Sequence, residues 1–86
     1  MIVYLEAPQG SSAEDYLDRA KLEMERVVGF RGNVTGAKVE GNRIAVTVEI
    51  NPKWDLPEAE KVSNLEEWIR AKTRVIFSIF RVQSIK

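Results

Sequence analysis

The last third of the chain, residues 57–86, has a hydrophobic pattern that fits two different structures. Beyond Pro57 it contains no glycine and no proline, the residues that most often interrupt regular structure. Stepped at 100° per residue, its apolar side chains fall on one arc roughly 180° wide, which predicts a helix from Pro57 to about Gln83. A helix packed on one surface needs a stripe of only about 100°. The wider arc therefore predicts a second, partner-facing surface.

The same pattern also permits a strand over residues 75–83. The segment VIFSIFRV is rich in β-branched and aromatic residues, which favour strands. As a strand it would be apolar on both faces, as expected for a strand buried on two sides. We prefer the helix and keep the strand as the alternative.

The first part of the chain gives clearer signals. Residues 1–7 have apolar side chains on both faces of a predicted strand. Residues 13–28 show apolar positions at helical spacing, which predicts an amphipathic helix. Gly29 follows as a candidate C-cap.

Residues 34–51 predict a β-hairpin that turns at Gly41-Asn42, because a two-residue Gly-Asn loop is typical of hairpins. The turn sets the expected register, with Glu40 opposite Arg43 and, further along, Thr35 opposite Val48.

This order of elements predicts one α+β domain over residues 1–86, with β-α-β-β-α topology. A three-stranded antiparallel sheet would carry both helices on one face. If residues 75–83 form a fourth strand, the fold becomes a ferredoxin-like β-α-β-β-α-β arrangement.

Composition excludes several kinds of chemistry. The 86 residues include no cysteine and no histidine, which removes thiol and imidazole nucleophiles and the usual zinc sites. No pair of carboxylates is marked out, and no glycine-rich nucleotide loop is present. No segment is apolar enough to span a membrane, and the start does not resemble a signal peptide. We therefore expect a cytoplasmic protein that is not an enzyme and carries no metal or cofactor.

Charge is balanced overall and uneven locally. Lys plus Arg and Asp plus Glu both number 13, and this balance argues against a general polyanion binder. Residues 68–86 hold five basic residues and no acidic one. On a helix, three of these would form a basic ridge suited to nucleic acid; they are Arg70, Arg74 and Arg81.

Three stretches, LEAPQGSSAEDYLDRA, KVEGNRIAVTVEI and KVSNLEEWIRAKTRVI, together with the element order, resemble the small Pcc-type subunit of the KEOPS complex, which makes threonylcarbamoyladenosine in tRNA. The resemblance implies a non-catalytic subunit of a tRNA-modifying assembly. Such a subunit forms a homo- or hetero-dimer, docks on a catalytic subunit through its last helix, and contributes to tRNA binding.

On this reading, apolar residues of the last helix divide between the core and a protein partner: Leu65, Trp68, Ile69, Ile76 and Phe80. Basic residues of the same segment would contact tRNA: Arg70, Lys72, Arg74 and Arg81. The alternative is a stand-alone ferredoxin-like binding module, such as a viral or mobile-element inhibitor of a host enzyme.

Overall fold

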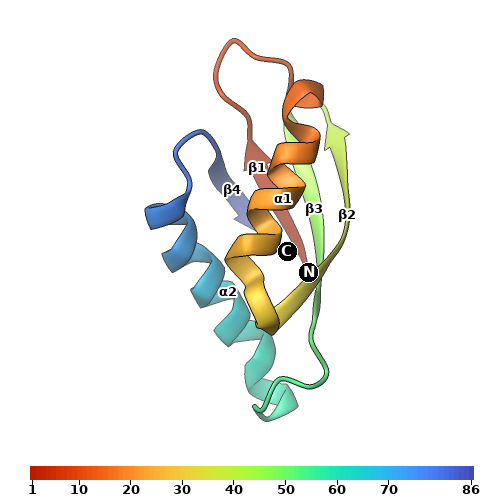
Figure 1. Cartoon of the computed structure of the whole chain (residues 1–86), viewed down its shortest axis with the longest axis vertical. Helices are drawn as coiled ribbons and strands as arrows, with labels where there is room; N and C mark the ends of the chain where they lie inside the picture. Colours follow the sequence, from red (N-terminus) through yellow and green to blue (C-terminus); the bar gives the residue numbers. More distant parts are fainter.

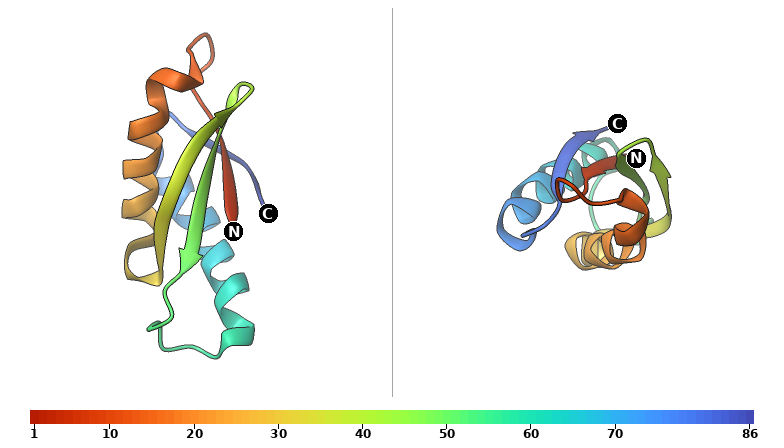
Figure 2. Two further views of the ribbon diagram at one scale, coloured as in Figure 1. Left: turned by 90° about the vertical axis from the view of Figure 1, so that its right-hand side faces the viewer. Right: turned by 90° about the horizontal axis from the view of Figure 1, so that it is seen from above.

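The fold is built from four antiparallel strands and two long helices, both of which cover the same face of the sheet (Figures 1 and 2). A computed structural model describes all residues from Met1 to Lys86. Strand order across the sheet is β2-β3-β1-β4. The elements are β1 (Ile2–Glu6), the 3-10 turn η1 (Ala13–Tyr16), α1 (Leu17–Val28), the 3-10 turn η2 (Gly29–Arg31), β2 (Gly32–Glu40), β3 (Arg43–Ile50), α2 (Glu58–Ile76) and β4 (Arg81–Ile85).

The α+β class is confirmed, whereas the preferred three-stranded sheet is wrong. The chain adopts the ferredoxin-like alternative, with its last strand at Arg81–Ile85 rather than at residues 75–83. The helix predicted to reach Gln83 ends at Ile76, because Phe77 has extended backbone angles of φ −73° and ψ 125°.

Long-range pairing explains why the helix ends there. β1 is apolar on both faces and lies between β3 and β4. The amide of Ile2 donates to the carbonyl of Lys86 at 2.7 Å, and the amide of Lys86 donates to the carbonyl of Ile2 at 2.8 Å. Without β4, one edge of β1 would lack these partners, and buried backbone groups left unpaired are costly. The two termini consequently lie side by side (Figure 1).

The β2–β3 hairpin turns at Gly41-Asn42 as predicted. Gly41 has a φ of 64°, a conformation that glycine adopts readily. Glu40 pairs with Arg43 as expected. A β-bulge then changes the register, so the predicted pairing of Thr35 with Val48 is wrong.

At the bulge, Val34 pairs with Val48 and Gly36 pairs with Thr47, which leaves Thr35 as the extra residue. Val34 therefore packs against the core. Thr35 is exposed to solvent.

The hydrophobic core lies between the sheet and the helices. Every strand residue in it comes from the two central strands, β1 and β3. Its buried members are Val3, Leu5, Ala13, Ala20, Met24, Val27, Val28, Ile44, Val46, Val48, Leu65, Ile69 and Phe80. The opposite face of the sheet carries no helix (Figure 2). No helix is both long and apolar enough to cross a membrane.

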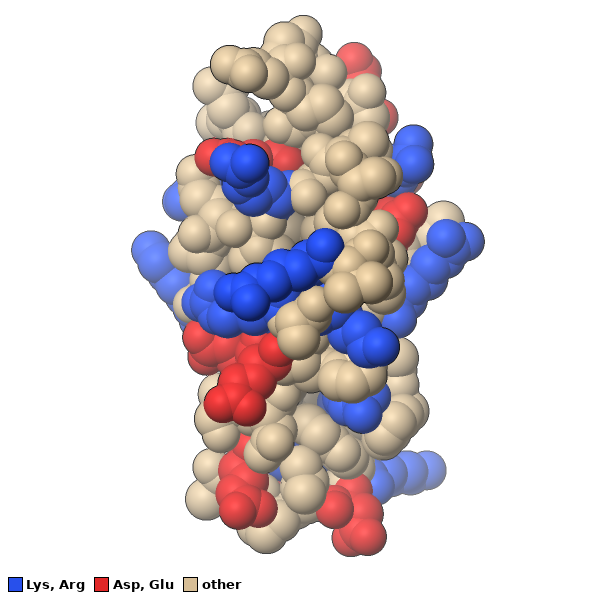
Figure 3. Space-filling model, turned by 90° about the vertical axis from the view of Figure 1, so that its left-hand side faces the viewer, with Lys and Arg blue, Asp and Glu red and all other residues tan.

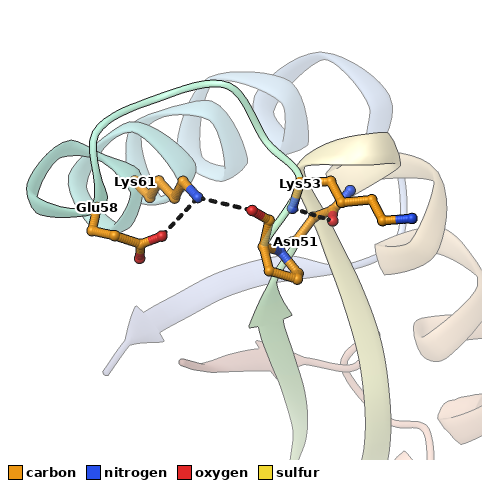
Figure 4. Close-up of polar contacts among 5 residues, drawn as sticks. Asn51, Lys53, Glu58 and Lys61 are labelled. Carbon is orange, nitrogen blue, oxygen red and sulfur yellow. Dashed lines mark hydrogen bonds and ion pairs between the residues drawn. The ribbon is translucent and has the colours of Figure 1, made fainter.

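A buried lysine fixes the start of α2 (Figure 4). Lys61 is 2% exposed, and its ammonium group donates to Glu58 Oε1 at 2.9 Å and to the carbonyl of Pro52 at 3.4 Å. In the same loop, the amide of Lys53 donates to Asn51 Oδ1 at 3.0 Å. The bonds of Lys61 join the β3–α2 loop to the first turn of α2. They also give partners to its buried ammonium group, which would be destabilising if it were left unpaired.

Candidate nucleic-acid interface

Three of the predicted basic residues line one hollow at the junction of α2 and β4, which we call the arginine hollow. Arg70 and Arg74 lie one turn apart on α2, and Arg81 begins β4. The hollow has a volume of about 510 Å³. Its remaining lining residues are Thr73, Phe77, Ser78, Ile79, Phe80 and Val82, so no carboxylate lines it.

Two of the three guanidinium groups are free of ion pairs. Arg70 Nη2 lies 3.2 Å from Glu66 Oε1, and both side chains are substantially exposed, so this contact is weak and easily exchanged. Arg74 and Arg81 are exposed and form neither an ion pair nor a side-chain hydrogen bond. The arginine hollow is therefore lined by three basic side chains, with Glu66 beside Arg70 and Glu6 opposite Arg81 in the β1–β4 register as the neighbouring carboxylates.

The surface view agrees with this charge distribution. Figure 3 looks at the side of the molecule on which α2 lies, and basic side chains form a band across its middle. Acidic side chains lie both below and above that band. A chain with a net charge of zero thus has a locally basic face.

The connection between α2 and β4 lines the arginine hollow and contains free backbone amides. The amide of Phe77 donates to the carbonyl of Thr73 at 3.0 Å, which closes the helix. The next three amides, those of Ser78, Ile79 and Phe80, donate no hydrogen bond within the chain. Successive free backbone N–H groups are a common way for proteins to bind anions.

Lys72, the fourth predicted basic residue, does not line the arginine hollow. Residues two positions apart on a helix point about 200° apart, so Lys72 lies away from both Arg70 and Arg74. Its ammonium nitrogen is 4.6 Å from the centroid of the Trp68 ring, and the residue is half-buried. The predicted basic set therefore divides into three residues that lie together and one that does not.

Most of the predicted partner-contact residues belong to the core of the chain itself. Leu65 and Ile69 are 0% exposed and Phe80 is 6% exposed, so they have no free surface for a partner. They face inward because α2 and the connection after it pack against the sheet. Trp68 is half-buried and donates its indole N–H to the carbonyl of Val27 at 2.6 Å. Ile76 is 42% exposed and remains available.

The exposed apolar residues of α2 do not form a continuous stripe. Val62 is 53% exposed, near the first turns of α2, which extend past the ends of the strands (Figures 1 and 2). Ile76 lies 14 residues later, roughly 21 Å along the helix axis. Val75 is 82% exposed, but its side chain points about 100° away from that of Ile76. The roughly 180° apolar arc predicted for residues 57–86 therefore has two main causes. Many of its residues pack inward on the sheet, and the helix ends at Ile76, before the last apolar residues of the arc.

Phe77 is the aromatic residue of the arginine hollow that the sequence analysis did not assign to binding. It is the first residue after α2 and is half-buried. The run RVIFSIFRV, in which aromatic residues lie between two arginines, was the available signal.

Comparison with known proteins finds no family model, no curated protein and no solved structure that matches this chain. No three Cys, His, Asp or Glu side chains come together as potential metal ligands.

Proposed function

We propose that this chain is a non-catalytic binding subunit of a tRNA-modifying assembly of the threonylcarbamoyladenosine kind, and that it contacts RNA phosphates through the arginine hollow. One observation carries the RNA contact: Arg70, Arg74 and Arg81 line a single hollow whose lining includes no carboxylate. Guanidinium groups bind phosphate oxygens through paired, charge-assisted hydrogen bonds. The free amides of residues 78–80 add donors that suit the same oxygens.

The contact is expected to be modest and dependent on salt. Each phosphate neutralised by a basic side chain changes the slope of log K against log salt by about 0.7 to 0.9. With three arginines, the chain alone should bind RNA with limited affinity, and its binding constant should depend only weakly on salt concentration. A larger assembly would supply the remaining contacts to tRNA.

A protein partner is the second part of the proposal, and it rests on the sequence resemblance. The chain supports it in one place, where the exposed side chains of Val75 and Ile76 lie at the end of α2 beside the arginine hollow. A partner that docks there would reach the RNA-contacting residues and the free end of α2 together.

The second candidate function is a stand-alone ferredoxin-like binding module that inhibits a host enzyme. The fourth strand favours it, because the resemblance implies a three-stranded sheet and the chain has four strands. In this case the arginine hollow would bind an acidic surface of the enzyme.

The RNA contact is tested with unmodified tRNA by fluorescence anisotropy at 50 mM and 150 mM salt. Arg74→Glu combined with Arg81→Glu should weaken binding roughly tenfold or more and lower the salt slope by about 1 for each lost contact. The matched control is Lys21→Glu combined with Arg26→Glu, which makes the same charge change at two exposed positions of α1. Equal affinities for both double variants would refute the RNA contact at this site.

The assembly is tested separately, by capture of the tagged chain from its own cells and mass spectrometry of the proteins that accompany it. Recovery of a threonylcarbamoyl transferase subunit would support the tRNA-modifying assembly. Recovery of a host enzyme without that subunit would contradict it and favour the inhibitor.

A further inference from the structure

Phe77 is held in a fixed position at the edge of the arginine hollow. Its ring centroid lies 5.8 Å from that of Phe80, with an angle of 66° between the ring planes. Phe80 is itself anchored in the core and lies 6.1 Å from Tyr16 at an angle of 88°. Edge-on contacts of this kind are favourable and leave a ring face uncovered by the neighbouring ring. Phe77 is thus supported by the core while it also lines the hollow.

The surroundings of Phe77 combine the two features that bind single-stranded nucleic acid. Arg74 precedes it in the last turn of α2, and Arg81 follows it at the start of β4. All three residues line the same hollow. A positive groove for the backbone and an aromatic ring for a base are the usual elements of such sites.

An unpaired nucleotide can contact both the arginines and the Phe77 ring, whereas a duplex can contact only the arginines. In an RNA duplex the bases are stacked inside the helix, so a protein reads the phosphates and the 2′-hydroxyls. Arginines alone would therefore bind paired and unpaired RNA in a similar way. A ring beside them adds an interaction that only an unstacked base can make.

The open face of the sheet, where ferredoxin-like domains can stack bases, offers no comparable ring. Tyr4 is the only aromatic residue in the four strands. It is 8% exposed, and the guanidinium carbon of Arg43 lies 3.9 Å from its ring centroid. The ammonium nitrogen of Lys86 lies 5.7 Å from the same ring. This ring is covered, whereas Phe77 lines a hollow together with Arg70, Arg74 and Arg81.

We infer that the arginine hollow binds an unpaired nucleotide of RNA, with the base stacked on Phe77 and the flanking phosphates on Arg74 and Arg81. This inference rests on the proposed RNA contact and specifies the form of RNA that the site accepts. Because stacking tolerates every base, the site distinguishes unpaired from paired RNA and does not read sequence.

The test compares a ten-nucleotide single-stranded RNA of mixed sequence with a twelve-base-pair RNA duplex, both labelled and measured by fluorescence anisotropy. Phe77→Leu keeps an apolar side chain but removes the ring. It should weaken binding of the single strand roughly tenfold and leave duplex binding within twofold. Phe77→Trp keeps an aromatic ring and should retain single-strand binding.

The outcomes separate the two proposals. If Phe77→Leu leaves the single strand bound as before, or weakens both RNAs equally, the nucleotide site is refuted, while the Arg74→Glu and Arg81→Glu pair still tests the phosphate contact. If neither RNA binds the unmodified chain, both proposals fail.

A measurement on the unmodified chain tests the same site without a substitution, so its result does not depend on whether the Phe77→Leu variant folds. Titration with the single-stranded RNA should shift the ring-proton resonances of Phe77, because a stacked base adds its own ring current. Unchanged Phe77 resonances at saturation would overturn the inference.

Discussion

The guanidinium carbon of Arg31 lies 3.6 Å from the centroid of the Trp68 ring, which joins the α1–β2 connection to α2. Phe30 approaches the same guanidinium group, with its ring centroid at 4.7 Å. The Trp68 ring also contacts Lys72 and donates its N–H to Val27. One indole therefore fixes how the end of α1 sits against the middle of α2, the helix that carries two of the three arginines of the hollow.

Replacement of Arg31 should weaken this helix contact. We expect Arg31→Ala to lower the free energy of unfolding by about 1–2 kcal/mol, because a partly desolvated cation–π contact and its packing are lost. Urea unfolding followed by circular dichroism measures the change. Arg26→Ala, which removes an exposed arginine without such a contact, should change stability by less than about 0.5 kcal/mol. Similar losses for both variants would show that the Arg31–Trp68 contact contributes little.

Two glycines of β2 should respond differently to alanine. A Cβ atom at Gly32 would lie 2.9 Å from the carbonyl oxygen of Glu49 and 3.1 Å from Val48 Cγ1, whereas at Gly36 it would meet nothing within 4 Å. Gly32→Ala should therefore destabilise the chain by about 1–3 kcal/mol through overpacking. Gly36→Ala should be neutral or stabilise it by less than about 1 kcal/mol, since it reduces the freedom of the unfolded chain.

Both predictions are checked by measuring the melting temperatures of the two glycine variants and of the unmodified chain under the same conditions. If Gly32→Ala melts at the same temperature as the unmodified chain, β2 does not approach β3 as closely as the structure shows.

Two isoleucines of α2 test which part of the helix belongs to the core. Ile69 is 0% exposed and Ile76 is 42% exposed. Ile69→Ala should cost about 2–5 kcal/mol, because it leaves a cavity in the core. Ile76→Ala should cost less than about 1 kcal/mol if the chain is a monomer in solution.

Denaturant titrations at several protein concentrations measure both losses. A large, concentration-dependent loss for Ile76→Ala would mean that a second copy of the chain covers the end of α2. A small loss for Ile69→Ala would contradict the packing of α2 on the sheet.

Local sequence signals identified the elements that depend on short-range interactions. The Gly41-Asn42 turn set the position of the hairpin, because its first residue needs a positive φ, which glycine adopts readily. The bulge at Thr35 was not foreseen, because one extra residue in a strand leaves no clear mark in an alternating pattern. The helix before Gly29 was correct except that its first residues, Ala13–Tyr16, form a 3-10 turn.

The arginine hollow was foreseen in part. Helical spacing placed Arg70 and Arg74 together, since residues four apart share a face. Arg81 was expected beside them on a continuous helix, yet it reaches them from β4 after the chain has turned. Phe77 was not assigned to the site, because its position depends on where the helix ends.

Local pattern and composition were sufficient to predict the α+β class, the hairpin turn and the amphipathic first helix, and they show that the chain contains no cysteine or histidine. Tertiary structure alone decided whether residues 75–83 continue the helix. The helical and strand patterns of that segment are nearly equal, so the hydrogen bonds and packing between β4 and β1 determine its structure. Two further hydrogen bonds join Ile2 to Lys86, the residue that follows β4, although these residues lie near opposite ends of the chain. That pairing also places Arg81 and Phe77 beside Arg74 and so creates the arginine hollow.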